Sequence, residues 1–350
     1  MPPSRRAGHG AMVSRVKSRN PGIPGSGRAR SEPQRWLVLG GGYCGMRLVD
    51  QLLDLGHDVV VTHRASTDRY AIHHPAAPLA PNTSSPRPRP QPRVVVFDDA
   101  QGIVPDLSAL GPFTAVISTI PPGKDGVDPV QDRLGTALRQ DAPPWVGYLS
   151  TSGVYGDLQG DWADESLPPR SRIPRSRHRT HCEAAWQASG LAPLILRLPG
   201  IYGPGRSPFS RLHQRRARMI HKPRQVFSRV HVDDVVGAVL WCRRHGYRDT
   251  VVNVCDNRPC PSSELLGMAA HLLGCKLPPC ERYRDVKDSM GTMARSFWLE
   301  NRRISNRRLL SWGYVLRYPT YREGLVATLA EERGGNFNPV YHRADGLLAG

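Results

Sequence analysis

The sequence lacks any apolar run close to the ~20 residues that a membrane-spanning helix requires, and it lacks the apolar core of a secretion signal. We therefore expect a cytoplasmic protein with no membrane partner. It contains seven cysteines, an odd number that argues against a disulfide framework. Four residues separate Cys255 from Cys260 and Cys275 from Cys280, but Cys255 ends an apolar, strand-like run. We expect scattered thiols and no metal site.

Acidic residues are also scarce, since 48 lysines and arginines stand against 30 acids in 350 residues, a formal net charge of +18. The imbalance is strongest over residues 1–34, where Glu32 is the one acid in a segment rich in arginine, proline, glycine and serine. This composition predicts a disordered basic leader. Two interpretations stay open: a transit peptide, which would allow a plastid location, and a mis-called start with Met12 as an alternative initiator.

Short apolar runs alternate with helix-like segments between residues 36 and 198. Runs suited to buried strands cover residues 36–39, 59–62, 94–97, 113–118, 145–150 and 193–198, with helical segments between them. This alternation predicts an α/β fold, a Rossmann-type doubly wound parallel sheet with helices on both faces. We expect the Rossmann domain over residues 35–200, with a proline-rich insertion at 65–92. A smaller mixed C-terminal substrate lobe, interleaved with the sheet, should follow over 201–333, with a tail over 334–350.

A glycine-rich turn directly follows the first of these runs. The pattern Gly40-x-Gly42-x-x-Gly45 leads into a segment with helical spacing. The first glycine allows a tight turn, the second lets the backbone approach a pyrophosphate, and the third lets helix and strand pack closely. The amino end of the helix then presents N–H groups to the phosphates. The pattern predicts NAD(P) binding, with Tyr43 and Cys44 beside the cofactor.

The cofactor's identity depends on the end of the second run. An NAD site usually offers an acid there for the ribose hydroxyls, whereas this chain has Arg64, which suits a 2′-phosphate. We expect NADP rather than NAD, although Arg64 could be an ordinary surface arginine. Asp98 follows the third run and is a candidate partner of the adenine amino group, or an ordinary loop residue. Thr119 follows the fourth run and is expected in the cofactor site.

Three further segments arrive in the order seen in the extended short-chain dehydrogenase/reductases, the NAD-dependent epimerase/dehydratase family. Residues 150–156, 197–205 and 230–235 resemble this family's signatures, and with the glycine turn they cover about residues 35–330. The resemblance implies an oxidoreductase or epimerase in which a tyrosine is the acid/base. It also implies a lysine four residues on that holds the ribose, and a serine or threonine that orients the substrate. Thr151 lies where that serine or threonine belongs.

The expected tyrosine is missing. Alignment on Glu183 puts Arg175 at the tyrosine position and Arg179 at the lysine position, and the chain has no tyrosine between Tyr155 and Tyr202. Arginine stays protonated at neutral pH, so it can hold a ribose or phosphate but cannot transfer the proton. The chain is therefore identified as an atypical member. Residues 301–306 and 318–324 look like a bacterial and plastid subgroup of unassigned activity.

Other residues are candidates for the missing proton transfer. They are Tyr155, His178, His181 and His231, and we include Thr151, Tyr155 and Arg179 in the predicted catalytic set. Each has an ordinary structural alternative. Tyr155 would pack or line the site, His178 and His181 would lie on a solvated helix face, and His231 would cap a structural network.

Basic residues cluster at 170–179 and again at 211–224. A positive cleft would favour a small anionic substrate such as a nucleotide sugar, with Arg206 and His231 as contacts. The alternatives are a solvated basic face and a face that binds RNA non-specifically. No motif for specific nucleic-acid binding is present, and no aromatic residues interleave with these arginines. Two functions stay open, an enzyme with a non-standard acid/base and a non-catalytic NADP-binding sensor or scaffold. A homodimer is the oligomer we would test first.

Overall fold

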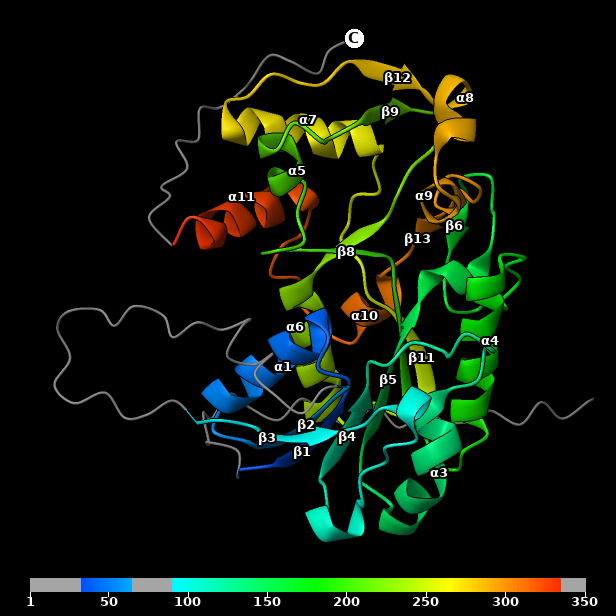
Figure 1. The fold of residues 1–350 in the computed structure, drawn as a ribbon, viewed down its shortest axis with the longest axis vertical. Coiled ribbons are helices and arrows are strands. Elements are labelled where there is room, and N and C mark those ends of the chain that lie inside the picture. Colours follow the sequence, from blue (N-terminus) through cyan, green and yellow to red (C-terminus); the bar gives the residue numbers. More distant parts are fainter. Residues whose placement is uncertain (1–32, 65–89, 335–350) are drawn as a thin grey trace, which may run out of the picture. The chain divides into compact units, whose positions relative to one another are not determined.

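The computed structural model describes residues 33–64 and 90–334. The leader, most of the insertion and nearly all of the tail therefore lie outside the described residues. Short apolar segments form the strands, because buried parallel strands need apolar side chains on both faces. Within the described ranges the central sheet has seven parallel strands in the order β11-β7-β5-β4-β1-β2-β3 (Figure 1). They are β1 (Arg35–Leu39), β2 (Asp58–His63), β3 (Arg93–Val96), β4 (Ala115–Ser118), β5 (Val146–Thr151), β7 (Leu194–Leu198) and β11 (Thr250–Asn253). The predicted doubly wound sheet is confirmed.

Helices cover both faces of this sheet (Figure 1). Alternate residues of a strand point to opposite faces, so Trp36 and Val38 of β1 pack in one core and Leu37 and Leu39 in the other. The first core takes α1 and α6, and the second takes α3 and α4. The bounds are α1 (Tyr43–Asp54), α3 (Pro129–Asp141), α4 (Pro174–Gln187) and α6 (Val232–Arg244). No helix in the described ranges combines the length and the apolar character needed to cross a bilayer.

The sheet extends beyond the domain end that we expected at residue 200. Strand β11 pairs in parallel with β7, from Thr250 opposite Leu194 to Asn253 opposite Arg197. Helix α6 packs against the same face as α1. The C-terminal segments thus return to the sheet after building part of the lobe.

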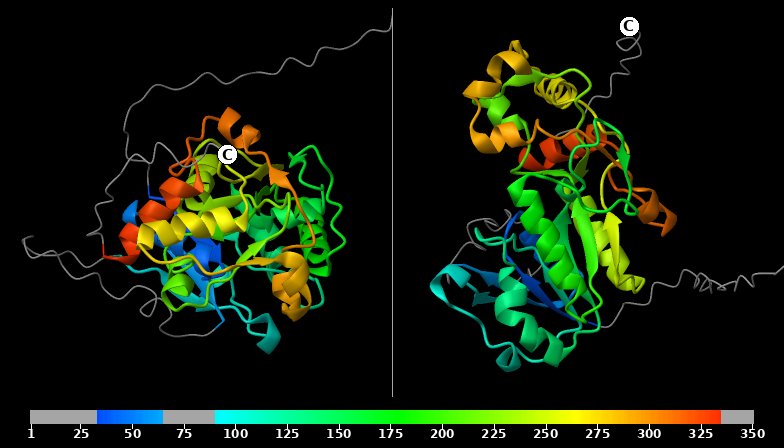
Figure 2. Two further views of the ribbon diagram at one scale, coloured as in Figure 1. Left: turned by 90° about the horizontal axis from the view of Figure 1, so that it is seen from above. Right: turned by 90° about the vertical axis from the view of Figure 1, so that its right-hand side faces the viewer.

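The C-terminal lobe has a core of its own. Apolar side chains of α5 (Phe209–His213), α7 (Ser262–Leu273) and α11 (Tyr321–Glu332) pack together, and α11 lies beside α7 (Figures 1 and 2). Short parallel pairs complete the lobe and join it to the loops above the sheet. The pairs are β8 (Gly200–Tyr202) with β10 (Arg229–His231), β9 (Met219–His221) with β12 (Cys280–Arg282), and β6 (Trp162–Ala163) with β13 (Arg303–Ile304). The shorter helices are α8 (Tyr283–Val286), α9 (Thr292–Ser296) and α10 (Arg307–Ser311).

Candidate functional site

The glycine turn joins β1 to α1 at the carboxyl edge of the sheet. Gly40 has a φ of 104°, which favours glycine. A Cβ on Gly45 would lie 2.0 Å from the carbonyl oxygen of Gly40, so helix and turn approach too closely for any side chain. A Cβ on Gly42, the N-cap of α1, would meet nothing within 4 Å. The turn is therefore closed on its inner side and open at Gly42, where a phosphate would approach the helix.

Two residues beside the turn hold its backbone. Thr119 donates from Oγ1 to the carbonyl oxygen of Gly40 at 2.8 Å, and Thr62 accepts from the Gly40 N–H at 2.8 Å. Tyr43 donates from its hydroxyl to the carbonyl oxygen of Pro204 at 3.1 Å, so its ring ties the turn to the lobe. Burial raises the pKa of the Tyr43 hydroxyl.

The remaining cofactor candidates are spread along the same edge of the sheet. Burial raises the pKa of the Cys44 thiol to about 11, which leaves it protonated and unreactive at neutral pH. Arg64 follows β2 and is exposed. Asp98 follows β3 and is buried, with its backbone paired to Ile103. The cofactor roles of Arg64 and Asp98 remain predictions.

A cavity of about 900 Å³ opens between the carboxyl edge of the sheet and the lobe. Thr151 at the end of β5 and Arg179 on α4 line it, and their catalytic roles remain predictions. Thr151 also accepts from the N–H of Gly153 at 3.1 Å. Arg179 donates from Nη1 to the Tyr148 hydroxyl at 2.8 Å and to the Leu149 carbonyl at 3.2 Å. These bonds fix the guanidinium at the ends of the central strands.

Other residues of α4 also reach the cavity. Arg175, Ser176 and His178 line it. Of the two interpretations of His178, the solvated helix face does not fit, because its half-buried ring packs closely over Gly126, where an added Cβ would lie 2.7 Å from Cδ2. His181 is exposed and is not among the lining residues. No tyrosine of the described residues lines the cavity.

Tyr155 does not contribute to this cavity, which contradicts its predicted catalytic role. Its side chain is fully buried, and its hydroxyl donates to Oδ1 of Asn253 at 2.8 Å. The Arg197 guanidinium carbon lies 4.8 Å from its ring centroid. Burial raises the pKa of Tyr155. The residue packs the interior between β5 and β11, which sequence order alone could not reveal.

His231 is likewise structural, so its predicted substrate contact is wrong. It is 2% exposed and caps α6, with Nδ1 accepting from the N–H of Asp233 at 3.2 Å. Its Nε2 lies 3.1 Å from Oγ1 of Thr328 on α11. Burial lowers the pKa of His231 to about 4. The imidazole is therefore neutral at pH 7 and joins α6 to α11.

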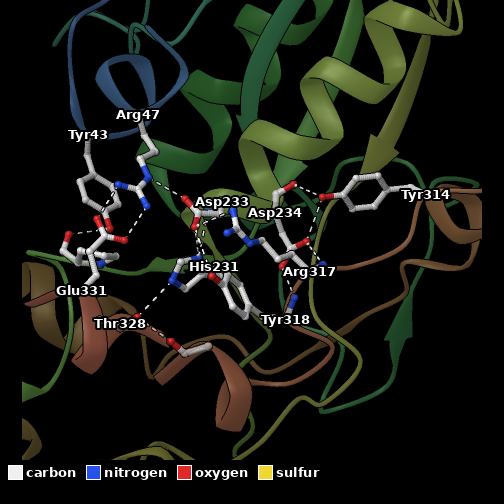
Figure 3. A network of polar contacts seen from close by, with 12 residues as sticks. Tyr43, Arg47, His231, Asp233, Asp234, Tyr314, Arg317, Tyr318, Thr328 and Glu331 are labelled. Atoms are coloured by element: carbon white, nitrogen blue, oxygen red, sulfur yellow. Dashed lines mark hydrogen bonds and ion pairs between the residues drawn. The ribbon is translucent and has the colours of Figure 1, made fainter. Parts of the chain in front are cut away.

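A polar network surrounds His231 (Figure 3). Arg47 of α1 donates to Asp233 at 2.6 Å and to both carboxylate oxygens of Glu331 at 2.7 and 2.8 Å. Asp234 accepts from the backbone N–H groups of Arg317 and Tyr318 at 2.7 and 2.9 Å. The network links the helix that follows the glycine turn to the C-terminal lobe. The residues 230–235 thus hold parts of the fold together rather than line the cavity.

The cavity lining is strongly cationic. Its charged residues include one carboxylate, that of Glu300, which binds Arg302 at 2.7 Å and accepts from Ser171 at 2.6 Å. Arg206 lines the cavity, with its guanidinium carbon 5.6 Å from the Tyr43 ring centroid, and its substrate contact remains a prediction. The cationic lining residues are Lys124, Arg175, Arg179, Arg206, Arg229 and Arg302. An anion is the ligand that such a lining attracts.

Several of the cationic lining residues could not be predicted from the sequence. Lys124 follows β4, Arg229 begins β10 and Arg302 precedes β13, and apart from their basic character they carry no signal of a shared site. The aromatic side of the cavity, which includes Phe227 and Phe297, was also missed. The only available hint was the general excess of arginine, because the lining is assembled from segments nearly 180 residues apart.

Comparisons with known proteins agree with this architecture. Residues 130–255 match the model of the NAD dependent epimerase/dehydratase family. A solved structure, described as a functionally unknown conserved protein from Silicibacter pomeroyi DSS, is 35% identical, with a TM-score of 0.74. The match covers 85% of this chain and 99% of that one.

Two further relatives are more distant. Protein YeeZ of Escherichia coli strain K12 is 26% identical over 222 residues, which cover 61% of this chain and 75% of its own. A dTDP-glucose 4,6-dehydratase of Bacillus anthracis strain Ames, solved in complex with NAD, is 16% identical with a TM-score of 0.67. That match covers 87% of this chain and 97% of the dehydratase, and at this identity it shows the fold alone.

Proposed function

We propose, because the chain belongs to the NAD-dependent epimerase/dehydratase family, that it binds a nicotinamide dinucleotide and acts as an oxidoreductase or epimerase on a small anionic substrate. The observation that carries the proposal is the cavity at the carboxyl edge of the sheet. It combines Thr151 and Arg179, at the ends of the central strands, with cationic side chains from the lobe. Ligands of doubly wound sheets bind at this edge.

The glycine turn fits the cofactor's pyrophosphate. The open space at Gly42 and the uncapped start of α1 leave room and N–H donors for an anion. Thr62 and Thr119 hydrogen-bond the N–H and the carbonyl oxygen of Gly40. These bonds hold this part of the turn in place before a ligand arrives. Preorganisation of this kind reduces the entropic cost of binding.

NADP is the cofactor we propose over NAD. The support is Arg64, an exposed guanidinium at the end of β2, where a 2′-phosphate of the adenine ribose would lie. Guanidinium groups bind phosphate through two parallel hydrogen bonds.

The chemistry would divide between the cofactor and the chain. When bound, the nicotinamide accepts or supplies a hydride. Arg179 would bind the nicotinamide ribose, since Nη1 is held by Tyr148 and the other nitrogens remain available in the cavity. Thr151 would orient a substrate hydroxyl or carbonyl. His178 would exchange the proton, because it is the only histidine among the described lining residues and no tyrosine is there.

A second candidate function is a non-catalytic NADP-binding sensor or scaffold. The absence of tyrosine from the described cavity lining favours it, because the family's usual proton donor has no direct substitute there. The cationic cavity would then bind a regulatory anion instead of a substrate.

Binding and turnover measured together distinguish the two candidates. NADPH binding is followed by fluorescence, and hydride transfer is then tested over a panel of nucleotide sugars and small anionic carbonyl compounds. Turnover that falls in Thr151→Ala and His178→Asn, with NADPH affinity unchanged, is the result expected for an enzyme. Tight NADPH binding without turnover of any compound would favour the sensor. Failure to bind either NADPH or NADH would refute both.

A further inference from the structure

The side chain of Arg175 is held at the cavity by two weak partners. Its Nη1 donates to the sulfur of Met293 at 2.9 Å, and its guanidinium carbon lies 4.3 Å from the ring centroid of Phe297. Both partners belong to the α9 region, both line the cavity, and they are 65% and 54% exposed. Their contact with Arg175 places two exposed apolar side chains beside a charged group of the cavity.

The geometry leaves the strong donors of Arg175 available. A guanidinium is planar, so it stacks through its face while its N–H groups point outward in the plane. A thioether sulfur is only a weak acceptor. Among the described residues, none bonds Nε or Nη2 of Arg175. Phe297 and Met293 thus hold the guanidinium and leave one edge free for a two-pronged contact with an oxyanion.

Among the described residues, no carboxylate forms an ion pair with this guanidinium. Glu300 is the acid whose charge acts on Arg175, and its carboxylate is already engaged by Arg302 and Ser171. Arg175 is an exposed residue, yet partial desolvation of its guanidinium lowers its pKa; the charge of Arg302 acts in the same direction, and Glu300 opposes both. An anion from outside the chain would relieve this imbalance.

We propose that Arg175 is a specificity-determining residue, which binds an acidic oxygen group of the substrate, a carboxylate or a phosphate, while Phe297 holds its guanidinium in position. This inference rests on the proposed function only in assigning the cavity to a substrate. At the position where relatives have a proton-transferring tyrosine, this chain therefore has an anion-binding residue. The substitution changes what the position recognises and removes its acid/base chemistry.

The test uses simple anions as probes. Inorganic phosphate and malonate are titrated calorimetrically into the full-length protein, at constant ionic strength, with and without saturating NADPH. Arg175→Gln should weaken binding of at least one probe about 10- to 100-fold, because a hydrogen-bonded charge contact is lost. The matched control is Arg177→Gln, which removes the same charge from an exposed position of α4 outside the cavity lining. It should change the affinity less than about twofold if the effect is local.

Two further variants keep the inference falsifiable if Arg175→Gln fails to fold. Arg175→Lys keeps the charge but loses the planar guanidinium, and Phe297→Leu removes the ring. Each variant should therefore weaken binding of the probe anion about 2- to 5-fold. A preference for phosphate would indicate a phosphorylated substrate, and a preference for malonate a carboxylic acid. Equal losses in Arg175→Gln and Arg177→Gln would overturn the inference, as would no probe binding to the wild type.

The outcome separates this inference from the proposed function. Arg175-dependent anion binding in a protein that binds no NADPH would leave the inference standing and refute the proposed function. NADPH-dependent turnover of an anionic compound that is indifferent to Arg175→Gln would do the reverse.

Discussion

Arg197 of β7 and Glu183 of α4 form a salt bridge in the interior, with 2.7 Å between Nη2 and Oε2 and side chains that are 5% and 3% exposed. The Arg197 Nε also lies within 3.2 Å of both carboxylate oxygens, and Ser150 donates to Glu183 at 2.5 Å. This contact joins α4 to two strands of the sheet. The cavity residues Arg175 and Arg179 are carried by the same helix, so their positions depend on it.

Breaking this pair should destabilise the protein strongly. Glu183→Gln leaves the Arg197 charge buried without its partner, and we expect a loss of about 3–5 kcal/mol in the free energy of unfolding. Urea denaturation measures it. Glu281→Gln is the matched control, because Glu281 binds Arg218 at the same 2.7 Å but at the surface, where solvent screens the pair and the loss should be much smaller. Similar losses of stability in the two variants would show that burial does not make the Glu183–Arg197 pair more costly to break than a surface pair.

The buried imidazole of His231 should make stability depend on pH. Its folded pKa is about 4 against 6.5 for the free group. As pH falls below 6.5 the unfolded chain takes up a proton that the folded protein does not bind, so stability decreases until about pH 4. His231→Asn keeps a capping side chain at α6 but removes this titration. The stability advantage of the wild type should therefore shrink by on the order of 2–3 kcal/mol between pH 7.5 and 4.5. A constant difference would contradict a buried neutral His231.

Asp256 should make the stability of the protein depend on pH in the direction opposite to that of His231. It is 2% exposed, and burial raises its pKa from 3.8 to about 7. As pH rises above 3.8 the unfolded chain ionises first, so stability is lost progressively up to about pH 7. Asp256→Asn cannot ionise, and its stability relative to wild type should rise by on the order of 4 kcal/mol between pH 4 and 7.5. Urea denaturation at several pH values measures this, and a flat difference would refute it. Because the two groups oppose each other, single variants are needed to see either.

Two glycines of the turn should respond differently to the same substitution. Gly45→Ala places a Cβ 2.0 Å from the Gly40 carbonyl oxygen, so we expect a loss of about 1–3 kcal/mol in the free energy of unfolding. Gly42→Ala meets no atom, and its loss should stay below about 1 kcal/mol. Its methyl group instead occupies the approach to α1, so NADH and NADPH affinity should fall. Unchanged affinity in a folded Gly42→Ala protein would contradict the pyrophosphate site.

The NADP assignment depends on Arg64. Arg64→Ala should weaken NADPH binding about 10- to 100-fold, because a charged contact with the 2′-phosphate is lost. The affinity for NADH should stay nearly unchanged. Fluorescence titration measures both. Arg93→Ala is the control, since Arg93 is also exposed but begins β3, at the opposite edge of the sheet. Equal losses for the two cofactors would rule out the assignment.

Local sequence was sufficient to predict the strands and the glycine turn. The apolar runs that end at Leu39 and at Leu198 became buried strands in the expected order, because a parallel strand is specified by its own side chains. The turn could be predicted for a similar reason, since backbone conformation at Gly40 and close packing at Gly45 exclude other residues. The sequence also singled out Arg175 and Arg179, and both reach the cavity.

Burial and long-range contacts decided the rest. Tyr155 and His231 lie in segments that resemble family signatures, yet one packs against β11 and the other joins α6 to α11. His178 lines the cavity from α4, the helix that Glu183 joins to Arg197 of β7. The sequence by itself determined the sheet and its phosphate-binding turn, whose requirements are local. Only the tertiary structure decided which arginines share a cavity, because that depends on packing between segments far apart in the chain.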